Sequence, residues 1–72
     1  MNNFTHEDKK FVEDLLTLMD YSNYNANLPK EKWWADYREA YNGLAEKYNN
    51  NKFYNDIIML WLMELKERNK VE

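Results

Sequence analysis

Five large side chains recur along the middle of this chain with spacings of three, four, three and four residues. They are Trp34, Tyr37, Tyr41, Leu44 and Tyr48. An α-helix completes a turn every 3.6 residues, so this spacing places all five on one face. Pro29 lies just ahead of them, in the first turn, where a missing N–H costs nothing. We therefore predict a helix over residues 28–48, and its mid-helix Gly43 suggests the close approach of another helix.

Two further helices are predicted on either side. Over residues 6–20, a Thr5–Asp8 capping box precedes two apolar rows, namely Phe11, Leu15 and Leu18 beside Val12, Leu16 and Met19. Over residues 52–69, a broad stripe comprises Phe53, Ile57, Trp61 and Leu65, widened by Tyr54, Ile58 and Leu62. Asn49–Asn51 should close the middle helix, because asparagine tolerates the left-handed conformation common at helix ends.

These elements predict an all-α fold: a compact bundle of three main helices in a single domain over residues 1–72. An extra short turn would fit the polar connection at 21–27. A chain of 72 residues buries only about 60% of its unfolded surface, so its core stabilises it weakly. There is no cysteine and only one histidine, His6. Disulfides and a zinc site are therefore excluded, which leaves helix packing or oligomerisation to support the fold.

The residue types needed for catalysis are scarce. Hydroxyl nucleophiles are limited to Ser22 and two threonines, and His6 lies near a helix end, where a base is poorly positioned. A single glycine excludes a glycine-rich phosphate loop. We therefore expect a non-enzymatic protein with no catalytic residues, no cofactor and no metal.

The net charge is −3, and it resides in the first half of the chain. Residues 1–36 carry seven acidic and four basic side chains, whereas residues 37–72 carry six of each. Neither half has the basic stripe that neutralises phosphates, which argues against direct nucleic-acid binding. The start of the chain lacks a signal-peptide pattern, and the longest apolar run, Ile57–Met63, is too short to span a bilayer. We expect a cytoplasmic protein with no membrane contact.

Residues 44–49 and the segment that follows resemble known regulatory motifs. Leu44-Ala45-Glu46-Lys47-Tyr48-Asn49 resembles the first helix and turn of a helix-turn-helix. Leu44-Ala45-Glu46 followed by Asn51–Ile57 and Trp61 looks like the C-terminal half of the Hha/YmoA family, small helical proteins that bind nucleoid-associated repressors. The 44–68 hairpin is also similar to the kinase-inhibiting Sda hairpin. The first two resemblances imply a DNA-associated transcriptional regulator or modulator, and the third implies an inhibitor.

An apolar surplus on the last helix is the strongest functional signal. Met59, Leu60 and Met63 point largely away from its main stripe, where a bundle helix normally carries polar residues. The first helix, a second copy of the chain or a partner protein could cover them. Methionine suits an adaptable binding surface as well as a core.

Trp33 and Trp34 are adjacent, so they point about 100° apart. Trp34 fits the central stripe and is assigned to the core. Trp33 is assigned to the edge beside Tyr37, as a rigid aromatic anchor for a partner. The alternative is that Trp33 packs against the 21–27 connection.

The sequence thus predicts a small protein-binding regulator or inhibitor. Its partner-binding residues would be Trp33, Tyr37, Met59, Leu60 and Met63. An origin in a phage or mobile element would fit its size. A DNA-associated regulator and a structural homo-oligomer, such as a homodimer, are the alternatives.

Overall fold

The first helix begins at the predicted capping box. In the computed structural model, which describes residues 3–24 and 27–71, α1 spans His6–Tyr21. The backbone N–H of Asp8 donates to Thr5 Oγ1 at 3.1 Å, and the Thr5 N–H donates to Asp8 Oδ2 at 2.9 Å. Two N–H groups that the helix leaves free are thereby satisfied.

The other two helices are α2, Lys30–Lys47, and α3, Lys52–Asn69. Asn51 caps α3, because its side-chain oxygen accepts from the Tyr54 N–H at 3.0 Å. The prediction of a left-handed asparagine after α2 was wrong. Among the described residues, only Lys70 has a positive φ, of 55°, and it ends α3. Of the three asparagines, Asn51 caps the start of α3, while the Asn49 N–H donates to the Glu46 carbonyl at the end of α2.

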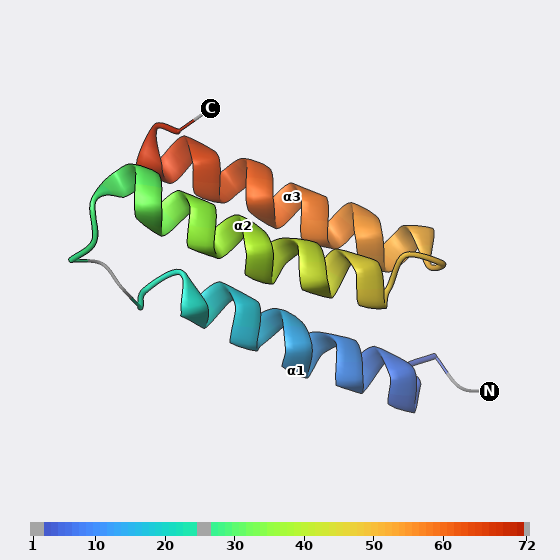
Figure 1. Cartoon of the computed structure of the whole chain (residues 1–72). Coiled ribbons are helices and arrows are strands. Elements are labelled where there is room, and N and C mark those ends of the chain that lie inside the picture. The colour runs from blue at the N-terminus through green and yellow to red at the C-terminus, as the bar shows by residue number, and fades with distance from the viewer. Residues whose placement is uncertain (1–2, 25–26, 72) are drawn as a thin grey trace.

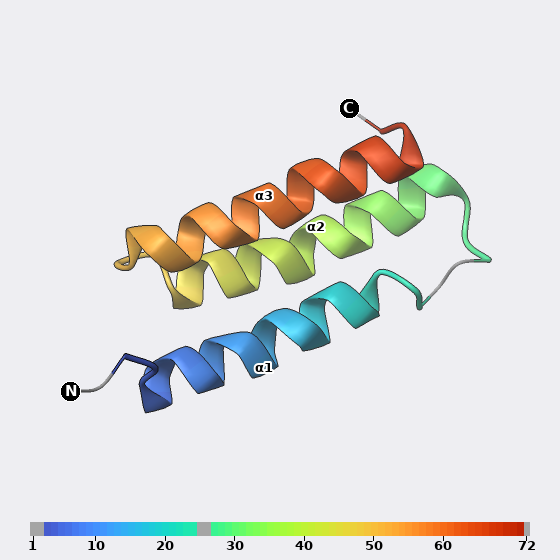
Figure 2. The same ribbon diagram turned by 180° about the vertical axis from the view of Figure 1, so that it is seen from behind.

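The three helices lie side by side, with α2 antiparallel to both of its neighbours (Figures 1 and 2). Every pair of helices is in contact. Backbone hydrogen bonds from Asn23 to Asp20 and from Tyr24 to Tyr21 form the expected extra turn after α1; residues 25 and 26 lie outside the described part of the chain. The predicted all-α three-helix bundle is confirmed.

The buried side chains form two clusters along the bundle. One comprises Leu18, Trp33, Tyr37, Trp61 and Leu65, and the other Phe11, Tyr48, Tyr54 and Ile58. Aromatic rings dominate both clusters. The Phe11 ring stacks on Tyr54 at 4.2 Å and meets Tyr48 edge-on at 5.1 Å between centroids. Most of the aromatic side chains therefore belong to the core or pack against it.

The assignment of the two adjacent tryptophans was the wrong way round. Trp33 is 8% exposed and belongs to the core, whereas Trp34 is only half-buried. The Trp33 indole N–H donates to the Ser22 carbonyl at 3.1 Å, and its ring stacks beside Tyr37. The connection after α1 therefore covers Trp33, as in the alternative interpretation of the sequence.

Within residues 3–24 and 27–71, none of the helices contains an apolar stretch of the length that a bilayer span requires.

Candidate functional site

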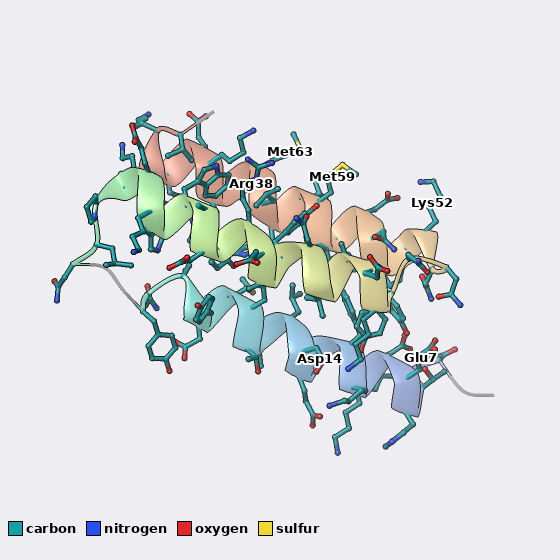
Figure 3. The ribbon with its side chains drawn as sticks, viewed as in Figure 1. Glu7, Asp14, Arg38, Lys52, Met59 and Met63 are labelled. Atoms are coloured by element: carbon teal, nitrogen blue, oxygen red, sulfur yellow. The ribbon has the colours of Figure 1, made fainter. Side chains whose placement is uncertain are left out.

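The outward side of α3 carries the apolar surplus that the sequence predicted. Met59, Leu60 and Met63 are 50%, 63% and 59% exposed. Met59 and Met63 point away from α1 (Figure 3). Within the described part of the chain no other helix covers them, a question that the sequence left open, and their role in binding stays a prediction.

Phe53 joins this surface, contrary to its predicted place in the main stripe. It is 65% exposed. Seven residues separate it from Leu60, so the two side chains leave the helix within about 20° of each other. That spacing is visible in the sequence and should have grouped Phe53 with Leu60. We refer to Phe53, Met59, Leu60 and Met63 as the outer face of α3.

The charges around the outer face neutralise one another. Lys52 Nζ lies 2.7 Å from Asp56 Oδ2, and Arg68 Nε lies 2.9 Å from Glu64 Oε2. With three basic and three acidic side chains, α3 carries no net charge. Such a surface offers apolar contact and no attraction for phosphates.

Trp33 and Tyr37, the other two predicted partner-binding residues, do not reach this surface. Tyr37 is 1% exposed. Its hydroxyl donates to the Leu18 carbonyl at 2.6 Å and accepts from the Trp61 indole N–H at 2.7 Å. Burial raises the pKa of Tyr37. Both residues are committed to the core, so the predicted aromatic anchor at the edge was wrong.

Val12 and Leu16 form a smaller exposed apolar pair on α1. They are four residues apart and therefore share one face of the helix. In the sequence they belong, with Met19, to the second of the two predicted apolar rows. The first row, with Phe11 and Leu18, is the one that reaches the core, because three helices bury only one stripe of each.

Comparison of the chain with protein-family models, with curated proteins and with solved structures gave no match. No family is assigned. The likeness to the Hha/YmoA and Sda sequences stays a resemblance of short motifs.

The serine and threonine hydroxyl groups of the described residues are bonded to the backbone and not to a base. Ser22 Oγ donates to the Met19 carbonyl at 2.7 Å, and Thr17 Oγ1 donates to the Glu13 carbonyl at 3.1 Å. Thr5 Oγ1 accepts from the Asp8 N–H. Residues 3–24 and 27–71 also hold no group of three His, Cys, Asp or Glu side chains that could bind a metal. The absence of enzymatic activity remains a prediction.

A groove of about 640 Å³ runs between α1 and α2. Its lining comprises Asp14, Thr17, Leu18, Asp20, Tyr21 and Tyr24 with Ala40, Gly43, Leu44 and Lys47. The close approach of a helix at Gly43 was predicted wrongly, because a Cβ atom built there meets nothing within 4 Å. The glycine faces the open groove instead.

Asp14 lies at one end of this groove, at the centre of a network of charged and polar side chains. Its Oδ2 atom accepts from Lys47 Nζ at 2.8 Å and from the Tyr48 hydroxyl at 2.7 Å, and Lys10 lies 3.4 Å from Oδ1. The Lys47 and Tyr48 hydrogen bonds lower the pKa of Asp14 to about 2. Burial and the bond to Asp14 raise the pKa of Tyr48 to about 12. The network joins α1 to the end of α2.

We expect Asp14→Asn to lower the free energy of unfolding at pH 7 by about 1–2 kcal/mol. Because its folded-state pKa is depressed, the carboxylate stabilises the fold above pH ~4, and this contribution is lost as the pH falls from ~4 towards 2. The acid limb of the stability curve should therefore flatten in the variant. Urea unfolding between pH 2 and 7 measures both effects. Asp56→Asn, which breaks an exposed pair, should cost under ~0.5 kcal/mol; equal losses would contradict the assignment.

Proposed function

We propose that this protein is a non-enzymatic regulator or inhibitor that binds another protein through the outer face of α3. The supporting observation is that four large apolar side chains are at least half exposed on one side of the helix. The opposite side of α3 supplies Tyr54, Ile58, Trp61 and Leu65 to the core. A bundle helix needs only one apolar stripe to pack in the core, so a second, exposed stripe indicates a binding surface for a partner.

The chemistry of the outer face favours a protein partner over a nucleic acid. Burying Phe53, Leu60 and the two methionines removes apolar surface from water, at roughly 1.5–3 kcal/mol for each side chain that is fully covered. Methionine side chains adapt to an irregular partner surface. The neutral charge of α3 gives no counterion-release contribution, which disfavours the DNA-associated alternative.

Leu60→Asp is expected to abolish partner binding while leaving the free energy of unfolding within about 0.5 kcal/mol of the parent. The matched control is Leu16→Asp, the same change at an equally exposed position on α1. A photo-crosslinking residue at position 63 should trap a partner in the parent and in Leu16→Asp, but not in Leu60→Asp. Equal crosslinking in all three proteins would contradict the proposal.

Light scattering distinguishes the homo-oligomer alternative from binding to a different protein. A monomer over a range of micromolar concentrations agrees with binding to a different protein. A dimer that Leu60→Asp converts to a monomer would instead assign the outer face to a second copy of the chain. The DNA-associated alternative requires binding to duplex DNA that weakens steeply with salt.

A further inference from the structure

The groove between α1 and α2 is a second surface, separate from the outer face of α3. All of its lining residues belong to α1, to the turn after it or to α2. Its volume of about 640 Å³ lies within the ~300–1,000 Å³ typical of small-molecule sites. Leu18, Ala40 and Leu44 supply apolar surface in it.

Gly43 opens the groove at a cost to α2. Glycine is among the poorest helix formers, and here it lies inside an 18-residue helix, four residues before its last residue. Because a Cβ atom at this position would meet nothing within 4 Å, no neighbouring atom requires a glycine. What the missing side chain provides is free space in the groove.

Asp20 is a second residue that local helix chemistry disfavours. It lies in the last turn of α1, where the helix dipole repels negative charge, and that turn carries no basic residue. Within residues 3–24 and 27–71, its only side-chain partner is the Tyr24 hydroxyl, which donates to Oδ2 at 3.2 Å. Asp14, by contrast, is neutralised by two lysines. Among the described residues, the carboxylate of the groove that has no lysine partner therefore lies at the Asp20 end.

Two aromatic rings accompany that charge. Tyr21 and Tyr24 line the same end, with ring centroids 6.0 Å apart and planes inclined by 44°. Aromatic faces attract cations, most strongly Trp but also Tyr, and a carboxylate beside them adds an ionic attraction. Gly43 and Asp20, which both destabilise the helices they belong to, thus line the same groove as the two tyrosine rings. Such local conflicts concentrate at functional sites.

We propose that the α1–α2 groove binds an organic cation with an apolar body, of the arylalkylammonium class. Its ammonium group lies against Asp20 and the rings of Tyr21 and Tyr24. Its apolar body extends past Gly43 over Ala40 and Leu44. Anions of the same shape are rejected, because the end of the groove that would receive their charge is negative.

The test is a titration of the whole isotope-labelled chain with 2-phenylethylammonium, followed by amide NMR shifts. Saturable shifts centred on Tyr21, Tyr24 and Gly43 are expected, with a Kd on the order of 1 mM for so small a probe. The matched probe of opposite charge, 3-phenylpropionate, should cause no saturable shift there. Equal binding of the two probes, or shifts confined to Met59 and Met63, would overturn the proposal.

Three variants test the residues. Asp20→Asn should weaken the Kd at least fivefold and raise Tm, and Gly43→Ala should raise Tm by ~4–8 °C. Gly43→Leu, which fills the groove, should also weaken the Kd at least fivefold. Asp56→Asn is the control and should leave the Kd unchanged. Unchanged affinity in Asp20→Asn would refute the site even if Gly43→Leu proved unstable. Leu60→Asp should not alter the Kd, which keeps this result independent of the outer face of α3.

Discussion

Trp33→Ala is expected to unfold the protein, whereas Trp34→Ala leaves it folded. Truncating a buried tryptophan costs about 3–5 kcal/mol, which matches the roughly 3–5 kcal/mol that a core of this size supplies. Trp33 is 8% exposed, stacks on Tyr37 and holds the turn after α1 through Ser22. Trp34 is half-buried at the margin of the same cluster. Its removal should cost about 1–2 kcal/mol.

Circular dichroism at 222 nm during thermal and urea unfolding measures this contrast. The parent and Trp34→Ala should show cooperative transitions, and Trp33→Ala should show little helix at 25 °C. Trp33→Phe, which keeps an aromatic ring but loses the bond to Ser22, should fall between them. If Trp33→Ala melted like the parent, the indole would not be part of the core.

Tyr37→Phe should lower the free energy of unfolding by about 2–3 kcal/mol, although it removes a single oxygen atom. That oxygen accepts from the buried Trp61 indole N–H and donates to the Leu18 carbonyl. Phenylalanine leaves the Trp61 donor buried without a partner, and an unsatisfied buried donor carries its full desolvation penalty. For a domain of this length, Tm should fall by ~10–20 °C.

Tyr41→Phe is the matched control one turn further along α2. Tyr41 is half-buried, and no hydrogen bond to another described residue involves its hydroxyl. Its loss should cost under ~0.5 kcal/mol. A double-mutant cycle of Tyr37→Phe with Trp61→Phe should show a coupling of ~1–2 kcal/mol, because each change removes the same bond. Additive effects would contradict the proposed Tyr37–Trp61 link.

Both predictions concern aromatic residues for which the sequence allowed two placements. The spacing from Trp34 to Tyr48 indicates a helix and one buried face, but neighbouring residues at the margins of a stripe differ in direction by only ~100°. Whether Trp33 or Trp34 turns inward depends on what lies opposite. The turn after α1 passes over Trp33 and accepts its indole N–H through Ser22. That contact joins residues eleven positions apart, which helical periodicity cannot encode.

The two candidate surfaces also differ in how much of them could be predicted from the sequence. The sequence showed that Met59, Leu60 and Met63 point away from the main stripe of their helix. It did not show whether the first helix, a second copy of the chain or a partner covers them. Phe53 was readable from its seven-residue spacing to Leu60. The groove could not be predicted from the sequence, since a glycine such as Gly43 can either admit a neighbouring helix or leave open space.

The local sequence was sufficient for the three helices, the Thr5–Asp8 capping box and the class of fold, whereas the role of Asn51 as the cap of α3 was not predicted. Helix periodicity, the Thr5–Asp8 box and the Asn51 cap act between residues at most a few positions apart. The tertiary structure alone decided which of several apolar margins is buried, and that a groove opens between α1 and α2. Those outcomes depend on the relative rotation of packed helices, which arises from contacts between residues distant in the chain.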